Sequence, residues 1–363
     1  MSILLFLIIL IVLVIVHELG HFIVSKWAGI EVKEFGLGFP PRIFGKIWRG
    51  TLYSLNWIPF GGFVKIFGEN PEEVAVTEEE KKKNFSYKPR PIQALVLVAG
   101  ISFNILFAWL LISIGFMTGF PSSVGDTANG TISNPQIVIT EVVTGFPAEK
   151  AGLQVGDKIL TLEASSQRIE HLTPEGVQNF IGSHGGDSIR VQYERGNETG
   201  LLSVTPRSDS VLNKSVIGIS MDMIGTLKLP FFPALYEGAK LTGYVIKTVA
   251  VGLVRFVWSA VTLNAHFSEV TGPVGIISLV GSAEKLGFVY LLSFTAFISL
   301  NLAVLNFIPF PALDGGRLLF VLIESIKRSP IKPKIANMIN SVGFAILIVL
   351  MVVVTLHDVV KLF

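Results

Sequence analysis

The chain has 363 residues, of which 50% are hydrophobic and only 15% are charged, and its formal net charge is +2. With a mean hydropathy of +0.62, it has the composition of a polytopic membrane protein. The small net charge and the lack of a basic–aromatic cluster argue against a nucleic-acid partner. The sequence has no cysteine, which excludes disulfides and thiolate chemistry, so any metal site must use His, Asp or Glu.

The first apolar segment, about residues 3–24, is long enough to cross a bilayer, which takes about 20 residues. It lacks the basic amino-terminal region and the small-x-small cleavage site of a signal peptide, so we expect a retained span. Near its end stand His17, Glu18 and His21. An ionisable side chain at bilayer depth costs about 3 kcal/mol, which makes these residues functional candidates.

His17 and His21 are four residues apart, so on a helix both imidazoles project from one face and can share one metal ion. Glu18 lies beside them, where it could accept a proton from a water on that metal. This HExxH pattern is typical of zinc hydrolases. The alternative is a pair of histidines that are satisfied by hydrogen bonds inside a helix bundle.

After the first span, residues 50–57 and 61–67 have the alternation of β-strands and are separated by a turn signal at residues 58–62. They predict a β-hairpin at the membrane face. The charge-rich stretch from residue 69 to residue 83 is expected to be a solvated loop.

A second span is predicted at about residues 92–116, and then the character of the chain changes. Residues 125–209 are polar, rich in glycine and β-branched residues, and numerous enough for one small domain. Strands are predicted at residues 136–143 and 187–193, and a short capped helix at residues 173–180.

The segment 230–266 is apolar, but Glu237, Lys240, Lys247 and Arg255 interrupt it. The three basic residues recur at nearly whole helical turns and so share one face. We therefore expect an interfacial or partly re-entrant amphipathic helix and no fifth span there.

The last two spans are predicted at about residues 288–310 and 339–356. Basic residues crowd the loop between the first two spans and the loop between the last two, so the positive-inside rule places both loops in the cytoplasm. Both termini and the middle domain then lie on the far side, and the first and third spans both end at the cytoplasmic side.

A catalytic zinc site usually has three protein ligands, so a third ligand is needed. The predicted topology places the remaining histidines on the far side, where they are expected to be ordinary polar residues: His171, His184, His266 and His357. A cytoplasmic carboxylate is expected instead. Glu31 and Glu34 are near in sequence, and Asp314 is the distant candidate, unless it only caps the following helix.

Two motifs carry a resemblance to a known family. HELGH (residues 17–21) together with NFIPFPALDG (residues 306–315) resembles the site-2 protease family of intramembrane zinc metalloproteases, peptidase family M50. PFGGFVK (residues 59–65) resembles the membrane-associated β-hairpin of that family, and TGPVGI (residues 271–276) a segment before its third core span. FPAEKAGLQVGDKIL (residues 146–160) is similar to the PDZ domains of bacterial members. The pattern matches the regulator-of-sigma-E protease group, in a form with a single PDZ domain.

The resemblance implies a polytopic α-helical membrane protein with four transmembrane helices, a cytoplasmic membrane-associated β-hairpin and one inserted PDZ-like β-rich domain. The expected organisation in chain order is this: a span at 1–24, a cytoplasmic loop with the hairpin at 25–90, a span at 91–119, the extracytoplasmic PDZ-like domain at 125–210, a linker with the interfacial helix at 211–285, a span at 286–311, a cytoplasmic loop at 312–335 and a span at 336–357.

By the same resemblance, His17, His21 and Asp314 are the ligands of one Zn²⁺ and Glu18 is the general base. Asn306 matches the asparagine that holds the substrate near the scissile bond, a role that suits an uncharged amide donor; the alternative is an interhelical hydrogen bond. The expected substrate-binding residues are Gly61, Gly62, Phe63, Val64, Lys65, Pro309 and Pro311, although Lys65 could equally be a surface charge.

The expected function is hydrolysis of peptide bonds within or near the transmembrane segment of single-span membrane proteins, in the bacterial cytoplasmic membrane. An anti-sigma factor or leftover signal peptides are the substrates that the resemblance suggests. Two alternatives remain open. One is a membrane metalloprotease of the prenyl-protein or heat-shock type, with a glutamate as third ligand. The other is a catalytically inactive membrane scaffold with a PDZ-like binding module.

Overall fold

The computed structural model describes residues 2–69, 77–124, 132–170, 172–196, 198–209, 214–262 and 272–360. The chain divides into two compact units. The helical unit comprises Met1–Ser113, Leu235–Glu284 and Tyr290–Phe363, and the β unit comprises Ile114–Ala234 and Lys285–Val289. Each unit is described by itself.

Seven helices account for most of the helical unit: α1 (Ser2–Trp27), α3 (Arg90–Thr118), α6 (Phe231–Val261), α7 (Pro273–Leu286), α8 (Phe288–Phe307), α9 (Asp314–Lys327) and α10 (Pro333–Val360). Among the described residues, 5 helices are long and apolar enough to cross a membrane: α1, α3, α6, α8 and α10. This is one more than the four spans that the sequence analysis predicts, and the additional one is α6.

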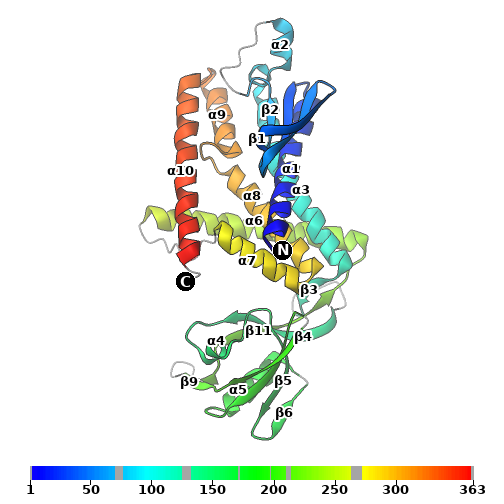
Figure 1. Ribbon diagram of the computed structural model, residues 1–363, viewed down its shortest axis with the longest axis vertical. Helices are drawn as coiled ribbons and strands as arrows, with labels where there is room; N and C mark the ends of the chain where they lie inside the picture. Colours follow the sequence, from blue (N-terminus) through cyan, green and yellow to red (C-terminus); the bar gives the residue numbers. More distant parts are fainter. Residues whose placement is uncertain are drawn as a thin grey trace. The chain divides into compact units, whose positions relative to one another are not determined.

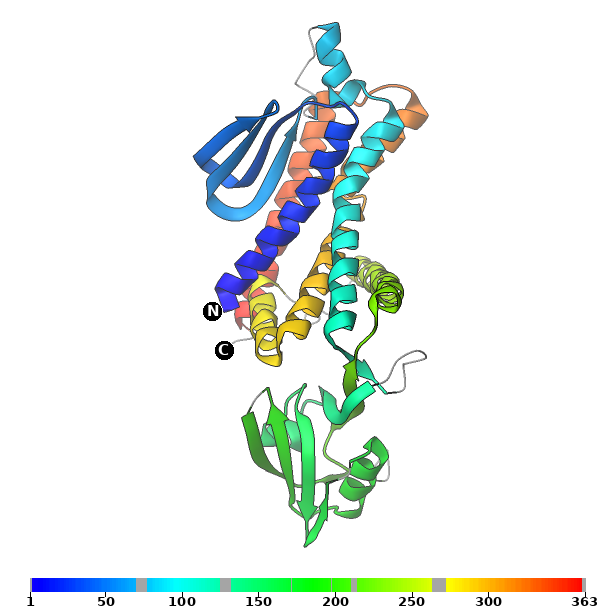
Figure 2. The same cartoon turned by 90° about the vertical axis from the view of Figure 1, so that its right-hand side faces the viewer.

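Helix α6 lies crosswise to α1 and α3, whereas α1, α3 and α10 run lengthwise through the helical unit (Figures 1 and 2). The indole Nε1 of Trp109 in α3 donates a hydrogen bond to the carbonyl of Leu235 at 2.9 Å and so ties the start of α6 to α3. A crosswise direction is what an interfacial helix would have, and the number of spans therefore remains a prediction.

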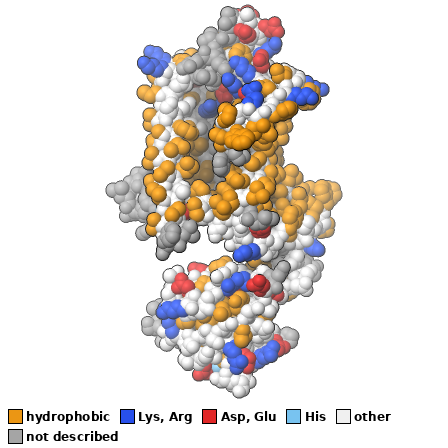
Figure 3. Space-filling model, viewed as in Figure 1, with side chains coloured by type: hydrophobic (Ala, Val, Ile, Leu, Met, Phe, Trp, Pro, Cys, Tyr) orange, Lys and Arg blue, Asp and Glu red, His pale blue; other side chains and the backbone are white. Residues whose placement is uncertain are grey.

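The surface of the helical unit is suited to lipid. Helix α10 exposes large apolar side chains along its length, among them Phe344, Val349 and Leu356. Hydrophobic side chains cover the middle of the visible face, and charged ones gather at the end that holds α2 (Glu78–Lys83) (Figure 3). The start of α1 and the end of α10 lie together at the opposite end (Figure 1). An apolar band of this extent is expected where a protein contacts a membrane.

The first cytoplasmic loop of the prediction contains an antiparallel pair of long strands, β1 (Val32–Trp48) and β2 (Thr51–Ile66). Their turn lies at Arg49 and Gly50, which both have positive φ angles, as a two-residue hairpin turn requires. Residues 32–37 of β1 pair with both arms of β2, that is with residues 62–66 and with residues 52–55.

This pairing differs from the predicted hairpin. The chain does reverse direction between residues 55 and 62, at the predicted turn signal, but the two predicted strands both pair with β1 instead of with each other. The charged stretch also differs, because Glu78–Lys83 forms the short helix α2 with a capping box between Thr77 and Glu80. Residues 70–76 of that stretch lie outside the described residues.

The β unit is built on a 7-stranded sheet, in which six strands have the order β3-β11-β4-β5-β7-β8 and the seventh, β6, pairs with β5. Its strands are β3 (Phe120–Ser123), β4 (Ile132–Val142), β5 (Lys158–Ala164), β6 (Gln167–Ile169), β7 (Ile189–Arg195), β8 (Glu198–Val204) and β11 (Ile219–Leu227). The strands β9 (Arg207–Asp209) and β10 (Lys214–Val216) form a separate pair. The hydrophobic core of the β unit includes Ile139, Leu162, Val177 and Val191.

Two short helices complete the β unit, α4 (Pro147–Ala151) and α5 (Pro174–Ser183). Helix α5 is the one expected at residues 173–180, and the Thr173 hydroxyl caps it by accepting a hydrogen bond from the Gly176 amide. The strands expected at residues 136–143 and 187–193 correspond to β4 and β7.

Candidate metal centre and catalytic site

The two histidines of the HELGH motif project from one face of the last turns of α1. Their Nε2 atoms are 3.2 Å apart. The carboxylate of Asp314, at the start of α9, reaches the same point: its Oδ2 lies 2.9 Å from His17 Nε2 and 3.3 Å from His21 Nε2. The three candidate ligand atoms all lie within 4.8 Å of one another, so residues from opposite ends of the chain share one site.

A tight turn between α8 and α9 brings Asp314 to the histidines. A Cβ on Gly315 would lie 2.2 Å from the Ile308 carbonyl oxygen, and one on Gly316 would lie 2.2 Å from the Phe310 carbonyl oxygen. Only glycine can take either position without displacing backbone. The sequence therefore needs both glycines of the ALDGG stretch for this turn.

Asp314 does not cap α9. The N-cap residue of α9 is Leu313, which makes no side-chain capping bond, so the Asp314 carboxylate is free to face the histidines. The preceding residue, Ala312, has a φ of 73°, and its amide donates a hydrogen bond to the side chain of Asn340 in α10 at 3.3 Å. A hydrogen bond to α10 thus stabilises the turn.

The site fits a metal ion by its donor set. Asp314 Oδ2 is buried, and within the described part of the chain it has no hydrogen-bond partner of good geometry, although two imidazole nitrogens stand beside it. Burial would raise the pKa of Asp314, but the interactions with His17 and His21 hold it below its usual value. Two imidazoles and a carboxylate are the ligand set of many catalytic zinc sites.

Helix α3 forms the wall behind the histidines. The carbonyl oxygen of Val96 accepts a hydrogen bond from His21 Nδ1 at 2.8 Å, which leaves Nε2 as the candidate ligand atom. The side chain of Asn104 lies 3.4 Å from His17 Nδ1. Between them, Gly100 leaves room for the rings, because a Cβ there would lie 2.4 Å from His21 Nε2.

Glu18 is half-buried beside the histidines and faces strand β2. The Val64 backbone is within hydrogen-bonding reach of its carboxylate, and a Cβ on Gly62 would lie 3.8 Å from Glu18 Cγ. The arm of β2 formed by residues 62–66 pairs with β1 on one side only, as far as the described residues show. A strand with an unpaired edge therefore stands next to the candidate base.

The other predicted substrate-binding residues lie in β2 and in the turn before Asp314. Gly61 has a φ of 93°. The ring of Phe63 stacks on Phe39 with the centroids 6.4 Å apart, and Lys65 is exposed. Asn306 is half-buried in the last turn of α8, and Pro309 and Pro311 belong to the turn before Asp314.

The competing ligands lie elsewhere. Among the described residues, the one group of three metal-binding side chains is His17, His21 and Asp314. The Glu34 carboxylate pairs with Arg42 at 3.4 Å. His184 Nδ1 hydrogen-bonds to the carbonyl of Phe180 inside the β unit. His357 lies near the end of α10, and His171 and His266 are outside the described residues.

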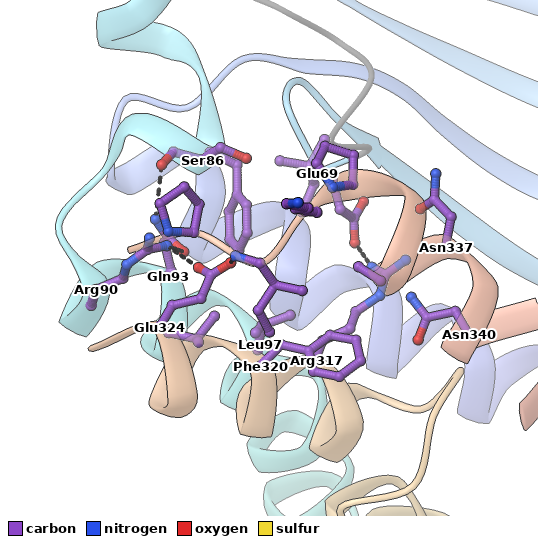
Figure 4. Close-up of a pocket in the computed structure, with 18 of the residues that line it drawn as sticks. Glu69, Ser86, Arg90, Gln93, Leu97, Arg317, Phe320, Glu324, Asn337 and Asn340 are labelled. Carbon is purple, nitrogen blue, oxygen red and sulfur yellow. Dashed lines mark hydrogen bonds and ion pairs between the residues drawn. The ribbon is translucent and has the colours of Figure 1, made fainter. Parts of the chain in front are cut away.

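A cavity of about 1080 Å³, lined by both charged and apolar side chains, lies between β2, α3, α9 and α10. Arg317, one turn after Asp314, projects into it and pairs with Glu69 (Figure 4). On another wall Arg90 pairs with Glu324 at 2.7 Å. Burial lowers the pKa of Arg317, and the charge of Glu18 opposes this effect.

Several residues of the site were missed in the sequence analysis. Val96, Gly100 and Asn104 recur every four residues within an apolar span, and the only available signal was an uncharged polar residue at bilayer depth. Arg317 follows the ALDGG stretch, but nothing in its spacing pointed to a cavity. The Val64 backbone carries no sequence signal at all.

Known proteins resemble this chain over nearly its whole length. The model of the peptidase family M50 matches residues 5–350. A Clostridium perfringens protein named as a zinc metalloprotease is 34% identical over 353 residues, which cover 96% of this chain and 95% of that protein. The regulator of sigma-W protease RasP of Bacillus subtilis is 28% identical, over 99% of this chain and 98% of its own.

Among solved structures, the PDZ domain of an SdrC-like protein from Listeria monocytogenes matches 25% of this chain and 92% of its own, at 18% identity. Its TM-score of 0.21 is too low to support an argument about the β unit.

Proposed function

The chain belongs to peptidase family M50 and is a membrane zinc metalloprotease, and we propose that it cleaves single-span membrane proteins within or near their transmembrane segments. The observation that carries this proposal is the convergence of His17, His21 and Asp314 at the end of an apolar helix. Ionisable groups at such a depth are costly, so they are expected only where they perform chemistry.

His17, His21 and Asp314 would hold the zinc ion through two Nε2 atoms and one carboxylate oxygen. Zinc, when bound there, supplies Lewis-acid chemistry, which makes a water more acidic and polarises the scissile carbonyl. Glu18 stands one residue from His17 with its carboxylate half-buried. It would accept the proton of the attacking water and return it to the leaving amine, the work of a general base and then a general acid.

Asn306 would complete the site as a hydrogen-bond donor. An amide can stabilise a developing oxyanion without competing for the metal, because it carries no charge. Its position in the last turn of α8, before the turn that carries Asp314, favours this role.

A transmembrane helix hides its peptide groups in internal hydrogen bonds, so it must unwind before it can be cleaved. The arm of β2 formed by residues 62–66 offers an unpaired edge beside Glu18, and the unwound segment could add to it as a further strand. We therefore retain Gly61, Gly62, Phe63, Val64 and Lys65 as substrate-binding residues, together with Pro309 and Pro311 in the turn before Asp314. The cavity that Arg317 lines would give water and the released product a path.

The proposed location is the bacterial cytoplasmic membrane, with the site toward the cytoplasm and both termini outside. The basic loops support this direction. The β unit would act as a PDZ-like screen that admits substrates whose bulky ectodomain has already been trimmed; binding of a C-terminal carboxylate is the alternative use. The Bacillus subtilis relative is named for regulating a sigma factor, so we propose a membrane-bound anti-sigma factor as one substrate class and signal-peptide remnants as another.

The test is the replacement Glu18→Gln in the full chain. It should lower cleavage of a single-span reporter by at least about 100-fold, because the base is lost, and leave the zinc content near one ion per chain. Unchanged cleavage would remove Glu18 from the mechanism. Single-span fragments that accumulate in membranes of a strain carrying this variant would identify the substrates.

A further inference from the structure

Asn104 holds a position that the proposed chemistry does not yet use. It lies in α3, is only 1% exposed, and its Nδ2 is 3.4 Å from His17 Nδ1. Its other side-chain atom, Oδ1, is buried and has no hydrogen-bond partner among the described residues. An unpaired buried oxygen is costly, so it calls for an explanation.

The protonation of His17 supplies that explanation. If His17 Nε2 is to offer a lone pair beside Asp314, the proton of the neutral imidazole must be on Nδ1. Nδ1 then needs an acceptor. An asparagine NH₂ group cannot serve as one, whereas the carboxamide oxygen can.

The two ends of an asparagine amide exchange places by a half-turn of the side chain, and coordinates alone do not distinguish them. After this half-turn, Oδ1 of Asn104 faces His17 Nδ1 and accepts a hydrogen bond from its N–H, while Nδ2 moves to the buried position of the oxygen. His21 is held in the same way, since its Nδ1 is bonded to the Val96 carbonyl on the same helix. One face of α3 then fixes both rings, with Gly100 leaving space between them.

We propose that Asn104 is a positioning residue of the metal centre, whose carboxamide oxygen accepts a hydrogen bond from His17 Nδ1 and so presents Nε2 to zinc. This inference rests on the proposed zinc site, but it adds a residue outside the HExxH and LDG motifs. Partners of this kind, one shell beyond the ligands, typically change metal affinity by 10–100-fold.

The competing explanation is that Asn104 only joins helices. Its backbone carbonyl does accept a hydrogen bond from Ser299 Oγ of α8 at 2.8 Å, but that contact does not involve the side chain. A purely architectural amide would make the side-chain oxygen unimportant for metal binding.

The experiment compares zinc affinity in purified full-length protein, measured by competition with a chromophoric chelator, for Asn104→Asp, Asn104→Ala and Asn104→Leu. Aspartate keeps an acceptor in either orientation, whereas alanine and leucine do not. We expect zinc binding within about 3-fold of wild type for Asp, and 10–100-fold weaker binding for Ala and Leu. The matched control Ser299→Ala, which removes the neighbouring contact to the Asn104 backbone, should bind zinc as wild type does.

A second readout does not depend on activity. With Co²⁺ in place of zinc, the visible absorption bands report ligand geometry, and they should shift in Asn104→Ala but not in Asn104→Asp. Equal affinity of the Ala variant and wild type, or weaker binding by Asp than by Ala, would overturn the inference. If Asn104→Leu does not fold, the comparison of zinc affinity between Asn104→Asp and Asn104→Ala still tests the inference. Failure of wild-type protein to bind zinc would instead refute the proposed function.

Discussion

The carbonyl oxygen of Ala99 stands 2.4 Å from the place where a Cβ on Gly20 would be. Helices α1 and α3 therefore meet backbone to backbone, one residue before His21. The same contact continues at Gly100, where a Cβ would lie 2.8 Å from His17 Cε1. The candidate metal centre thus depends on two glycines that let α1 and α3 approach each other closely.

Replacement of Gly100 by alanine should disturb the site without introducing any polar or charged group. The added methyl must displace the ring of His21, so we expect at least a 10-fold loss of zinc affinity and a matching loss of cleavage. The control is Gly243→Ala in α6, where a Cβ meets nothing within 4 Å; it should keep full activity and be as stable as wild type or up to about 1 kcal/mol more stable. Zinc titration and thermal unfolding of both variants measure this, and a Gly100→Ala protein with normal affinity would contradict it.

The third ligand can be tested by paired alanine variants. Asp314→Ala should lose zinc, because a carboxylate oxygen 2.9 Å from His17 Nε2 is removed. Glu34→Ala should keep its zinc, because the Glu34 carboxylate is directed to Arg42. Metal content by atomic emission distinguishes them. Loss of zinc only in Glu34→Ala would favour a protease of the prenyl-protein or heat-shock type, and stoichiometric zinc without turnover of any single-span protein would favour an inactive scaffold.

The two motifs that the structure brings together in the candidate metal centre could be recognised in the sequence because ionisable residues are unusual in apolar segments. His17 and Asp314 stand out as ionisable groups near the ends of two predicted spans. Because both spans are predicted to end at the cytoplasmic side, the two residues are expected at the same depth. Asn104 gives no such signal, because an uncharged amide in a span is also a common interhelical contact. The proposed role of Asn104 depends on its contact with Nδ1 of His17, and this contact can be seen only in the structure.

The β-hairpin shows where sequence reasoning failed and why. Residues 58–62 contain Pro59 and two glycines, which usually mark a turn, and the chain does reverse direction there, because residues 34–37 run parallel to residues 52–55 and antiparallel to residues 62–65. The sequence analysis predicts neither the second turn at Arg49 and Gly50 nor strand β1, whose first residues pair on both sides and so separate the two predicted strands. The alternation of apolar and polar residues indicates a strand but not the strand it pairs with, so the pairing could not be predicted from the sequence.

The proposed substrate edge leads to a test on the backbone of β2. Val64→Pro removes an amide at the position next to Glu18 and should lower kcat by about 10-fold or more, since a proline cannot donate to an added strand. Ile47→Pro places the same change in the far arm of β1, which pairs with residues 51–56, and should affect cleavage far less. Zinc content, expected to be normal in both, separates this effect from damage to the metal centre. Equal losses in the two variants would argue against β-addition at residues 62–66.

The β unit has its own internal anchor, which can be weakened without touching the metal centre. Asp157 is fully buried, and Arg195 binds its carboxylate through two contacts of 2.7 Å. This hydrogen bonding raises the pKa of Arg195 above its ordinary value. Arg195→Met would leave the Asp157 carboxylate buried without its charged partner, and we expect a loss of about 2–3 kcal/mol, moderated because Arg195 is partly exposed.

The matched control is Arg168→Met, which breaks the pair with Glu170, where both side chains are more than half exposed. That change should cost less than about 1 kcal/mol. Hydrogen exchange of β5 and β7 in the full-length protein measures both effects locally. If the β unit only screens ectodomains, Arg195→Met should leave cleavage of a short, pre-trimmed substrate unchanged while cleavage of an untrimmed one rises. A loss of cleavage of the short substrate would show instead that the β unit takes part in binding it.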